Sequence, residues 1–315
     1  MELIRGLHNL RPRHRGCVVT IGAFDGVHNG HRAVLGHLLE KAAELDLPSV
    51  VILFEPLPRE YFAPREAPAR LMSFREKFEA LEALGVDRVL RVRFDESLRT
   101  MGAVEFITRI FVDGLGAKYI VVGDDLRFGH DREGDFELMR AQGEIHGYQT
   151  MHTATLGISG TRVSSTRIRE ALENADFMLA EALMGRPYSI SGKVVFGQQR
   201  GRQLGAPTAN MELHRLRAPL LGVYVVEVVV EGEGAGDNAR PLPAVANVGT
   251  RPTVGDGFRA NLEVHLLDYS GDLYGKRLRV SFRQKIRDEQ KFESLDDLQT
   301  QIHRDIAYGR EFFDL

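Results

Sequence analysis

The sequence has a single cysteine and no surplus of charge of either sign. Cys17 is the one cysteine among 315 residues, so the chain can form neither an internal disulfide nor a zinc site built on cysteines. This favours a reducing compartment, and we expect the protein in the cytoplasm. Lys and Arg number 41 against 44 Asp and Glu, a formal charge of -3. Because a polyanionic duplex meets no positive field, nucleic acid is not an expected partner.

Long apolar runs are missing as well. The longest, residues 220–230, is interrupted by Glu227 and reaches about half of the ~20 residues that a membrane helix needs. Residues 1–16 carry several arginines and lack the apolar core of a signal peptide. We therefore expect neither export nor a membrane partner.

The remaining composition is that of an ordinary globular protein, with 43% hydrophobic and 27% charged residues. At roughly 150 residues per domain, a chain of this length predicts two domains. The spacing of apolar residues changes near residue 184. The predicted domains are therefore residues 1–183 and 184–315.

The first domain alternates β-branched runs with helical spacing. Residues 17–22 form one apolar run, and residues 34–45 then repeat apolar side chains every three or four positions. Further strands are expected at 49–54 and 119–122. This alternation predicts an α/β domain with helices on both faces of a parallel sheet. Four prolines in residues 55–68 predict an irregular loop near the strand ends.

The second domain has no helical spacing until its end. Strand-like runs separated by Gly and Asp predict a small antiparallel β-barrel, and they span residues 189–196, 223–230, 244–248, 260–267 and 278–283. A closing helix is expected, with Ser294 as its N-cap and Asp297 in its first turn. We expect it to cover or plug the barrel through a stripe made of Leu295, Leu298, Ile302 and Ile306.

A glycine-rich turn joins the first strand to the first helix. It reads Gly22-Ala23-Phe24-Asp25-Gly26-Val27-His28-Asn29-Gly30-His31. Its glycines allow close approach of a ligand, and a helix N-terminus favours anions, so the pattern predicts a phosphate site. His28 and His31 are three residues apart and can both lie beside that anion. The alternative is a tight turn with two surface histidines.

This string resembles the HxGH signature of the nucleotidyltransferase superfamily, in the GxFDGxHxGH form of bacterial bifunctional riboflavin kinase/FAD synthetases. It matches neither a GxGxxG nor a Walker A pattern, since no GK[ST] follows. The resemblance implies a Rossmann-like nucleotidyltransferase domain in which His28 and His31 are catalytic and stabilise adenylyl transfer. The ATP-binding residues that it implies here are Gly22, Phe24, Asp25, Gly26, His28 and His31.

Two further segments fit the same resemblance. Residues 121–134 look like the family's VGxDFRFGxxRxG pattern, with Leu126 where Phe is usual. The implied flavin-binding residues are Asp125, Arg127 and Phe128, although Asp125 can also be a simple turn cap. Residues 163–169 look like the SSTxIR motif, although a Ser/Thr run before a helix is by itself an ordinary N-cap. The motif implies that ATP phosphates are held by Ser165, Thr166 and Arg169.

The second domain opens with a glycine-rich stretch, residues 185–210. With Lys193, Arg200 and Arg202 nearby, it can wrap nucleotide phosphates, or it is a generic hairpin. In an extended chain Thr208 and Asn210 point to the same side. Their hydroxyl and amide oxygens suit a Mg²⁺ ion that is bound together with ATP.

Residues 201–210 resemble the GRxLGxPTAN pattern of the riboflavin kinase module, with Ala206 where Phe is common. Phe196 stands where that module often has His. The resemblance implies that Thr208 and Asn210 bind the metal, and that ATP is bound in the kinase by Gly197, Gly201, Arg202, Gly205, Thr208 and Asn210. Residues 246–253, 262–267 and 272–276 also look like this module. The resemblance implies that Glu263 is the catalytic base of the kinase. Without the resemblance, the usual interpretation of a single Glu on a strand is a solvated carboxylate.

The resemblance covers essentially the whole chain. It implies an enzyme whose barrel phosphorylates riboflavin to FMN and whose α/β domain adenylates FMN to FAD, releasing pyrophosphate. Both steps use ATP and Mg²⁺, so the implied partners are small molecules, and no oligomeric state is predicted. Two alternatives stay open. One is an adenylyltransferase with an inactive barrel, against which residues 207–210 and Glu263 argue; the other is a sensor that binds flavin or nucleotide without turnover.

Overall fold

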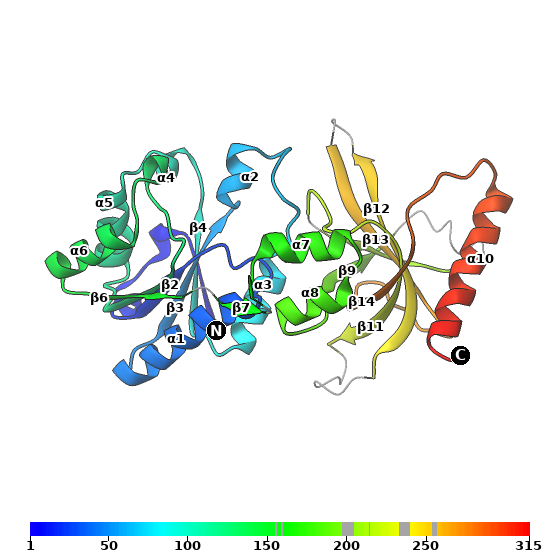
Figure 1. Cartoon of the computed structure of the whole chain (residues 1–315), viewed down its shortest axis with the longest axis horizontal. Coiled ribbons are helices and arrows are strands. Elements are labelled where there is room, and N and C mark those ends of the chain that lie inside the picture. Colours follow the sequence, from blue (N-terminus) through cyan, green and yellow to red (C-terminus); the bar gives the residue numbers. More distant parts are fainter. Residues whose placement is uncertain (155, 159, 197–204, 214, 233–239, 254–256) are drawn as a thin grey trace. The chain divides into compact units, whose positions relative to one another are not determined.

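A computed structural model describes residues 1–154, 156–158, 160–196, 205–213, 215–232, 240–253 and 257–315 (Figure 1). The chain forms two compact units. The first unit comprises residues 1–68 and 74–164, and the second comprises residues 69–73 and 165–315. Residues 165–183 thus pack with the second unit. The boundary at 183/184 stays a prediction about how the two functions divide the chain.

The first unit is built on a six-stranded parallel sheet, as the sequence predicted. The strand order is β1-β4-β3-β2-β5-β6. Only β2, β3 and β5 correspond to the expected apolar runs. The six strands are β1 (Glu2–Arg5), β2 (Val18–Ile21), β3 (Ser49–Glu55), β4 (Arg88–Arg93), β5 (Tyr119–Gly123) and β6 (Gln149–Thr153).

Helices cover both faces of this sheet. All of β2 and the first five residues of β3 are buried, and successive strand residues point to opposite faces, so neither face is open to solvent. Figure 1 shows α5 and α6 on one side of the sheet and α1 and α3 on the other. The helices are α1 (Asn29–Leu45), α2 (Pro58–Phe62), α3 (Phe74–Ala83), α4 (Glu96–Arg99), α5 (Ala103–Phe106) and α6 (Phe136–His146).

Two details of this unit bear on the expectations. The stretch 55–68 is not wholly irregular, because Pro58 starts the short helix α2, where its missing N–H costs no hydrogen bond. Cys17 is fully buried, as expected, and this burial raises the pKa of its thiol to about 12. The cysteine is therefore an inert core residue.

The second unit is a closed antiparallel barrel in the order β10-β13-β12-β11-β14-β9. This confirms the predicted barrel and adds a sixth strand, β10, to the five expected runs. The strands are β9 (Ser189–Val195), β10 (Ala209–Glu212), β11 (Gly222–Glu231), β12 (Leu242–Thr253), β13 (Gly257–Leu266) and β14 (Arg277–Arg287).

In the part of this unit that the structure describes, the helices are α7 (Ser165–Glu173), α8 (Phe177–Met184) and α10 (Leu295–Phe312). The ring of Phe177 meets Tyr224 of β11 edge-on at 5.9 Å and stacks on Phe282 of β14 at 6.4 Å, between ring centroids. Helix α8 therefore packs on the barrel through aromatic contacts.

Helix α10 closes the chain as predicted and packs against β11 and β12. Ser294 is its N-cap, and its Oγ accepts a hydrogen bond from the Asp297 backbone N–H at 3.1 Å. The predicted stripe is wrong at Leu295, which is 70% exposed. A Cβ at Gly309 would lie only 2.5 Å from the side chain of Val245 in β12, so α10 contacts the barrel closely near its C-terminal end. The first turn of α10, which contains Leu295, extends into solvent.

Candidate active sites

The signature turn, residues 22–28, leaves the carboxyl end of β2. The chain continues from β2 to β3 and β4 on one side of the sheet, whereas β5 and β6 lie on the other side. The strand order thus reverses at β2 and β5. Ligands of open parallel sheets bind in the crevice at such a reversal, beyond the carboxyl ends of the strands.

The backbone of the signature turn is strained at two positions. Phe24 and Val27 have φ angles of 45° and 40°, a region that β-branched residues such as Val27 rarely enter, and Gly26 has a φ of 95°. Phe24, Asp25 and Val27 are at most 3% exposed, so burial of their side chains holds the turn. Strain of this kind clusters at ligand sites, where it orients functional groups.

His28 and His31 form a stacked pair at the start of α1. Their ring centroids are 3.6 Å apart and the rings are 13° from parallel. His28 is the N-cap of α1, and its Nδ1 accepts the backbone N–H of His31 at 3.2 Å. Because Nδ1 of His28 is an acceptor, the proton of its neutral ring lies on Nε2, which is then a donor. His28 is 4% exposed, so the alternative of two surface histidines is wrong.

His31 lies where protonation is unfavourable. Burial lowers its pKa well below the usual value, and the charges of His28 and Lys77 act in the same direction. Its Nδ1 is buried and has no hydrogen-bond partner among the described residues. The ring is therefore neutral at pH 7 and keeps one polar atom available to a ligand.

The predicted flavin segment follows β5, the parallel neighbour of β2, and so emerges at the same edge of the sheet. Asp125 is exposed and accepts a hydrogen bond from Arg162 at 2.6 Å. Arg127 is also exposed. Phe128 is only 7% exposed and packs on Phe106, with 5.5 Å between centroids, so its ring belongs to the core. Flavin binding by these three residues stays a prediction.

The SSTxIR segment begins α7, in the second unit. Ser165 and Thr166 are its first two residues, and Arg169 donates from Nε to the Ala69 carbonyl at 2.6 Å. Val163, two residues before Ser165, belongs to the first unit, and a Cβ at Gly30 would lie 3.4 Å from its carbonyl oxygen. Val163, which directly precedes the two serines of the motif, therefore lies next to the start of α1, where the signature turn ends. Phosphate binding by the motif stays a prediction.

Three polar side chains line up across the barrel. Asn210 of β10 is paired with Glu263 of β13, and Glu263 is paired with Asn247 of β12. Directly paired residues in antiparallel strands point to the same face. Glu263 is half-buried, and its Oε1 accepts from Asn261 Nδ2 at 3.0 Å. A held, half-buried carboxylate argues against the alternative of a simply solvated one.

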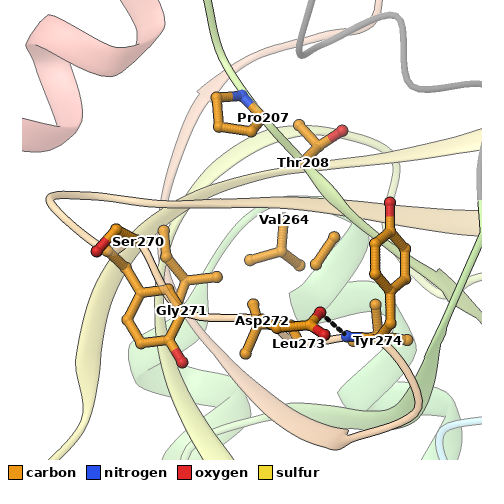
Figure 2. A pocket seen from close by; sticks show the side chains of 12 residues that line it. Pro207, Thr208, Val264, Ser270, Gly271, Asp272, Leu273 and Tyr274 are labelled. Carbon is orange, nitrogen blue, oxygen red and sulfur yellow. Dashed lines mark hydrogen bonds between the residues drawn. The ribbon is translucent and has the colours of Figure 1, made fainter.

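A cavity of about 540 Å³ lies beside these strands, with Ala209 and Val264 in its lining, and its volume is within the range of small-molecule sites (Figure 2). Thr208 and the loop after β13 border it, and Tyr274 N–H donates to Asp272 at 2.9 Å within that loop. Apolar side chains dominate the rest of the lining, among them Val194, Pro207, Val264, Leu266 and Leu273. The cavity suits a mostly apolar group, with Thr208 at its border.

Several predicted kinase residues lie outside the described residues: Gly197, Arg200, Gly201 and Arg202. Gly205 is described, and its φ of 77° is one that glycine adopts without strain. Among the described residues, no group of three or more His, Cys, Asp or Glu side chains could hold a metal ion. Thr208 and Asn210 offer oxygen donors only, which fits a Mg²⁺ ion that arrives with ATP rather than a resident metal.

Comparison with known proteins agrees with this arrangement. The FAD synthetase family matches residues 10–167, and the riboflavin kinase family matches residues 184–313. A protein named bifunctional riboflavin kinase/FMN adenylyltransferase from Pseudomonas fluorescens is 53% identical, with 98% of this chain and 97% of the relative covered. Its namesake from Escherichia coli K12 is 51% identical, with 100% and 99% covered.

The chain belongs to the family of bifunctional riboflavin kinases/FMN adenylyltransferases. A crystal structure described as a macrolide-efflux protein from Streptococcus pneumoniae has the same fold, with a TM-score of 0.77, 30% identity and coverage of 98% of this chain and 99% of its own. No helix in the described part of the present chain is long and apolar enough to span a membrane.

Membership of the family confirms the resemblance that the motifs indicated. The structure also adds residues that the sequence did not single out. One of them is Glu289, whose pKa is raised by partial burial. The charge of Glu263 raises this pKa further, whereas a hydrogen bond with Asn247 lowers it.

Lys77 is another residue that the sequence did not single out, a fully buried lysine beside the signature turn. Its only signal in the sequence is a lysine on the apolar side of an amphipathic helix.

Proposed function

We propose that the chain makes both flavin cofactors, FMN in the barrel and FAD in the parallel-sheet unit, with ATP as the co-substrate of each step. The observation that carries the proposal is that each segment of the chain that matches a family contains one of the two candidate sites described above. The FAD synthetase match contains the stacked histidines. The riboflavin kinase match contains the paired Asn210 and Glu263.

In the kinase step, the cavity bordered by Thr208 would take the adenine of ATP. Its largely apolar lining suits the base, and Thr208 at its border is two residues from Asn210. Mg²⁺, bound by Thr208 and Asn210 together with ATP, would neutralise the charge on the phosphates. Glu263, oriented by Asn261, accepts the proton of the ribityl hydroxyl as that oxygen attacks the γ-phosphorus.

In the adenylyl step, the phosphate of FMN attacks the α-phosphorus of ATP and pyrophosphate leaves. Charge then spreads over the non-bridging oxygens, and catalysis needs donors and orientation rather than a covalent nucleophile. Nε2 of His28 and the ring of His31 donate hydrogen bonds beside the N-terminus of α1. The resemblance assigns the β- and γ-phosphates to Ser165, Thr166 and Arg169, and the flavin to Asp125, Arg127 and Phe128.

The single buried cysteine supports the proposed cytoplasmic location, since nothing in the chain requires an oxidising compartment.

The decisive experiment incubates the purified chain with riboflavin and MgATP and follows the flavins by chromatography. FMN should form first and FAD after it, and FMN with MgATP should give FAD and pyrophosphate directly. FAD from FMN without any FMN from riboflavin would identify an adenylyltransferase with an inactive barrel. Tight binding of flavin without product would identify a sensor and refute the proposal.

A further inference from the structure

Lys77 is a lysine in an unusual environment. Its side chain is 1% exposed, and lysines are almost never fully buried unless their ammonium is paired. Its Nζ donates a hydrogen bond to the Ala23 carbonyl at 2.7 Å. Lys77 therefore connects α3 to the signature turn, although the two are 54 residues apart in sequence.

Its position on α3 shows why the side chain points inward. The apolar side of α3 includes Phe74, Phe78 and Leu81, and Lys77 lies three residues after Phe74 and four before Leu81. These spacings place it on the same side of the helix. An apolar residue there would avoid the desolvation of an ammonium, so burial of Lys77 calls for an explanation in terms of charge or hydrogen bonding.

The bonded carbonyl lies at a sensitive point of the turn. Ala23 directly precedes Phe24, the first residue with a positive φ, and the histidine pair follows four residues later. A donor that holds the Ala23 carbonyl therefore holds the chain where it bends away from β2. The charges that act on His31 are those of His28, on its own helix, and Lys77, from α3.

We propose that Lys77 is a positioning residue of the adenylyl-transfer site, whose buried ammonium fixes the strained turn through the Ala23 carbonyl and so aims the stacked rings of His28 and His31 at the ATP phosphates. This inference rests on the proposed adenylyltransferase function. A second consequence follows from the charge. A cation near His31 opposes protonation of that ring, so the His31 imidazole stays in the neutral form, which does not repel the ammonium.

The test compares Lys77→Met, which removes charge and donor, with Lys77→Gln, which keeps a neutral donor, and Lys77→Arg, which keeps both. Lys118→Gln, at an exposed lysine of the same unit, is the matched control. Each full-length variant is assayed for FMN adenylylation and riboflavin phosphorylation. His31 is titrated by NMR of ¹³C-labelled histidine and assigned by comparison with His31→Gln.

We expect Lys77→Met to lower kcat for adenylylation at least 100-fold, with riboflavin phosphorylation within twofold of the parent. In Lys77→Arg, kcat for adenylylation should be at least tenfold higher than in Lys77→Met. In Lys77→Met and Lys77→Gln the pKa of His31 should rise, while Lys118→Gln should leave it unchanged.

Adenylylation within threefold of the parent in Lys77→Met would overturn the proposal. So would a loss in which Lys77→Arg is no better than Lys77→Met and the titration of His31 does not move, because that pattern describes a purely structural lysine. If Lys77→Met does not fold, the same criteria apply to Lys77→Gln. A parent protein that makes no FAD refutes the proposed function instead, and the His31 titration still tests the effect of Lys77.

Discussion

Asn210 and Glu263 lie directly opposite each other on neighbouring strands of the barrel, 53 residues apart in the chain. Their side chains share a face, and Asn247 extends the row on the next strand. A proposed ligand of the metal and a candidate base are thus held at one cross-strand spacing, ~5 Å between Cβ atoms. The sheet register, rather than any flexible loop, sets this distance.

Replacement of Glu263 by Gln should stop the kinase step. Gln keeps the size of the side chain and can still hydrogen-bond Asn261, but it cannot take a proton. We expect kcat for riboflavin phosphorylation to fall by about 10²–10⁴-fold, with adenylylation of supplied FMN unchanged. Steady-state kinetics of both reactions on one preparation measure this. A variant that phosphorylates riboflavin at the parental rate would show that Glu263 is an ordinary strand carboxylate.

Replacement of His28 by Asn separates its two roles. Asn can still cap α1 but offers no Nε2 donor, so adenylylation should fall by about 10²–10³-fold while the protein stays as stable as the parent. His28→Ala also loses the cap, which should lower the free energy of unfolding by a further ~1 kcal/mol. Flavin chromatography and urea titration give the two readouts. Equal loss of both enzymatic reactions in folded His28→Asn would count against separate sites.

The depressed pKa of His31 predicts a dependence of stability on pH. In the unfolded chain a histidine gains its proton near pH 6.5, whereas the folded ring resists it. The unfolded state therefore binds more protons below that pH, and stability that is present above pH 6.5 is lost as the pH falls. The slope should be up to ~1.4 kcal/mol per pH unit from this group. Urea titrations of the parent and of His31→Gln at pH 7.5 and 5.5 check it; an identical loss in both would refute it.

Fragments should separate the two activities. Residues 184–315 are predicted to make FMN but no FAD. This fragment lacks α8, whose Phe177 packs on Tyr224 and Phe282, so a fragment of residues 165–315 should unfold at higher urea concentration. The difference should be at least ~2 kcal/mol, the value of fully burying one large apolar side chain, because α8 contributes the buried Leu183 as well as the half-buried Phe177. Equal midpoints would show that α8 adds nothing to the barrel.

A folded fragment of residues 165–315 without kinase activity would show that the first unit completes the kinase site. Both fragments also lack residues 69–73, whose Leu71 carbonyl accepts from Arg215 at 3.1 Å and from Tyr188 at 3.2 Å. The full-length chain with Arg215→Met lacks the hydrogen bond from Arg215 to Leu71, so it is the matched control for the loss of that contact in the fragments.

Local patterns in the sequence were sufficient for much of the fold. Apolar runs predicted β2, β3, β5 and five barrel strands, because buried strands of β-branched residues differ clearly from helical spacing. Some strands carried too little signal: β4 has three arginines among its six residues, and β1 and β10 are only four residues long. Leu295 fits the stripe of α10 by spacing, yet its exposure depends on where the helix meets the barrel.

The sequence by itself indicated the two reactions, adenylyl transfer and riboflavin phosphorylation. Short motifs with characteristic spacing identified the turn at His28 for the first and the segment that ends at Asn210 for the second. Only the tertiary structure decided what stands beside them. Glu263 meets Asn210 through strand register, and Lys77 reaches Ala23 because α3 packs beside a turn 54 residues earlier. Such contacts depend on how distant elements pack, and the spacing of residues along one segment carries no information about that packing.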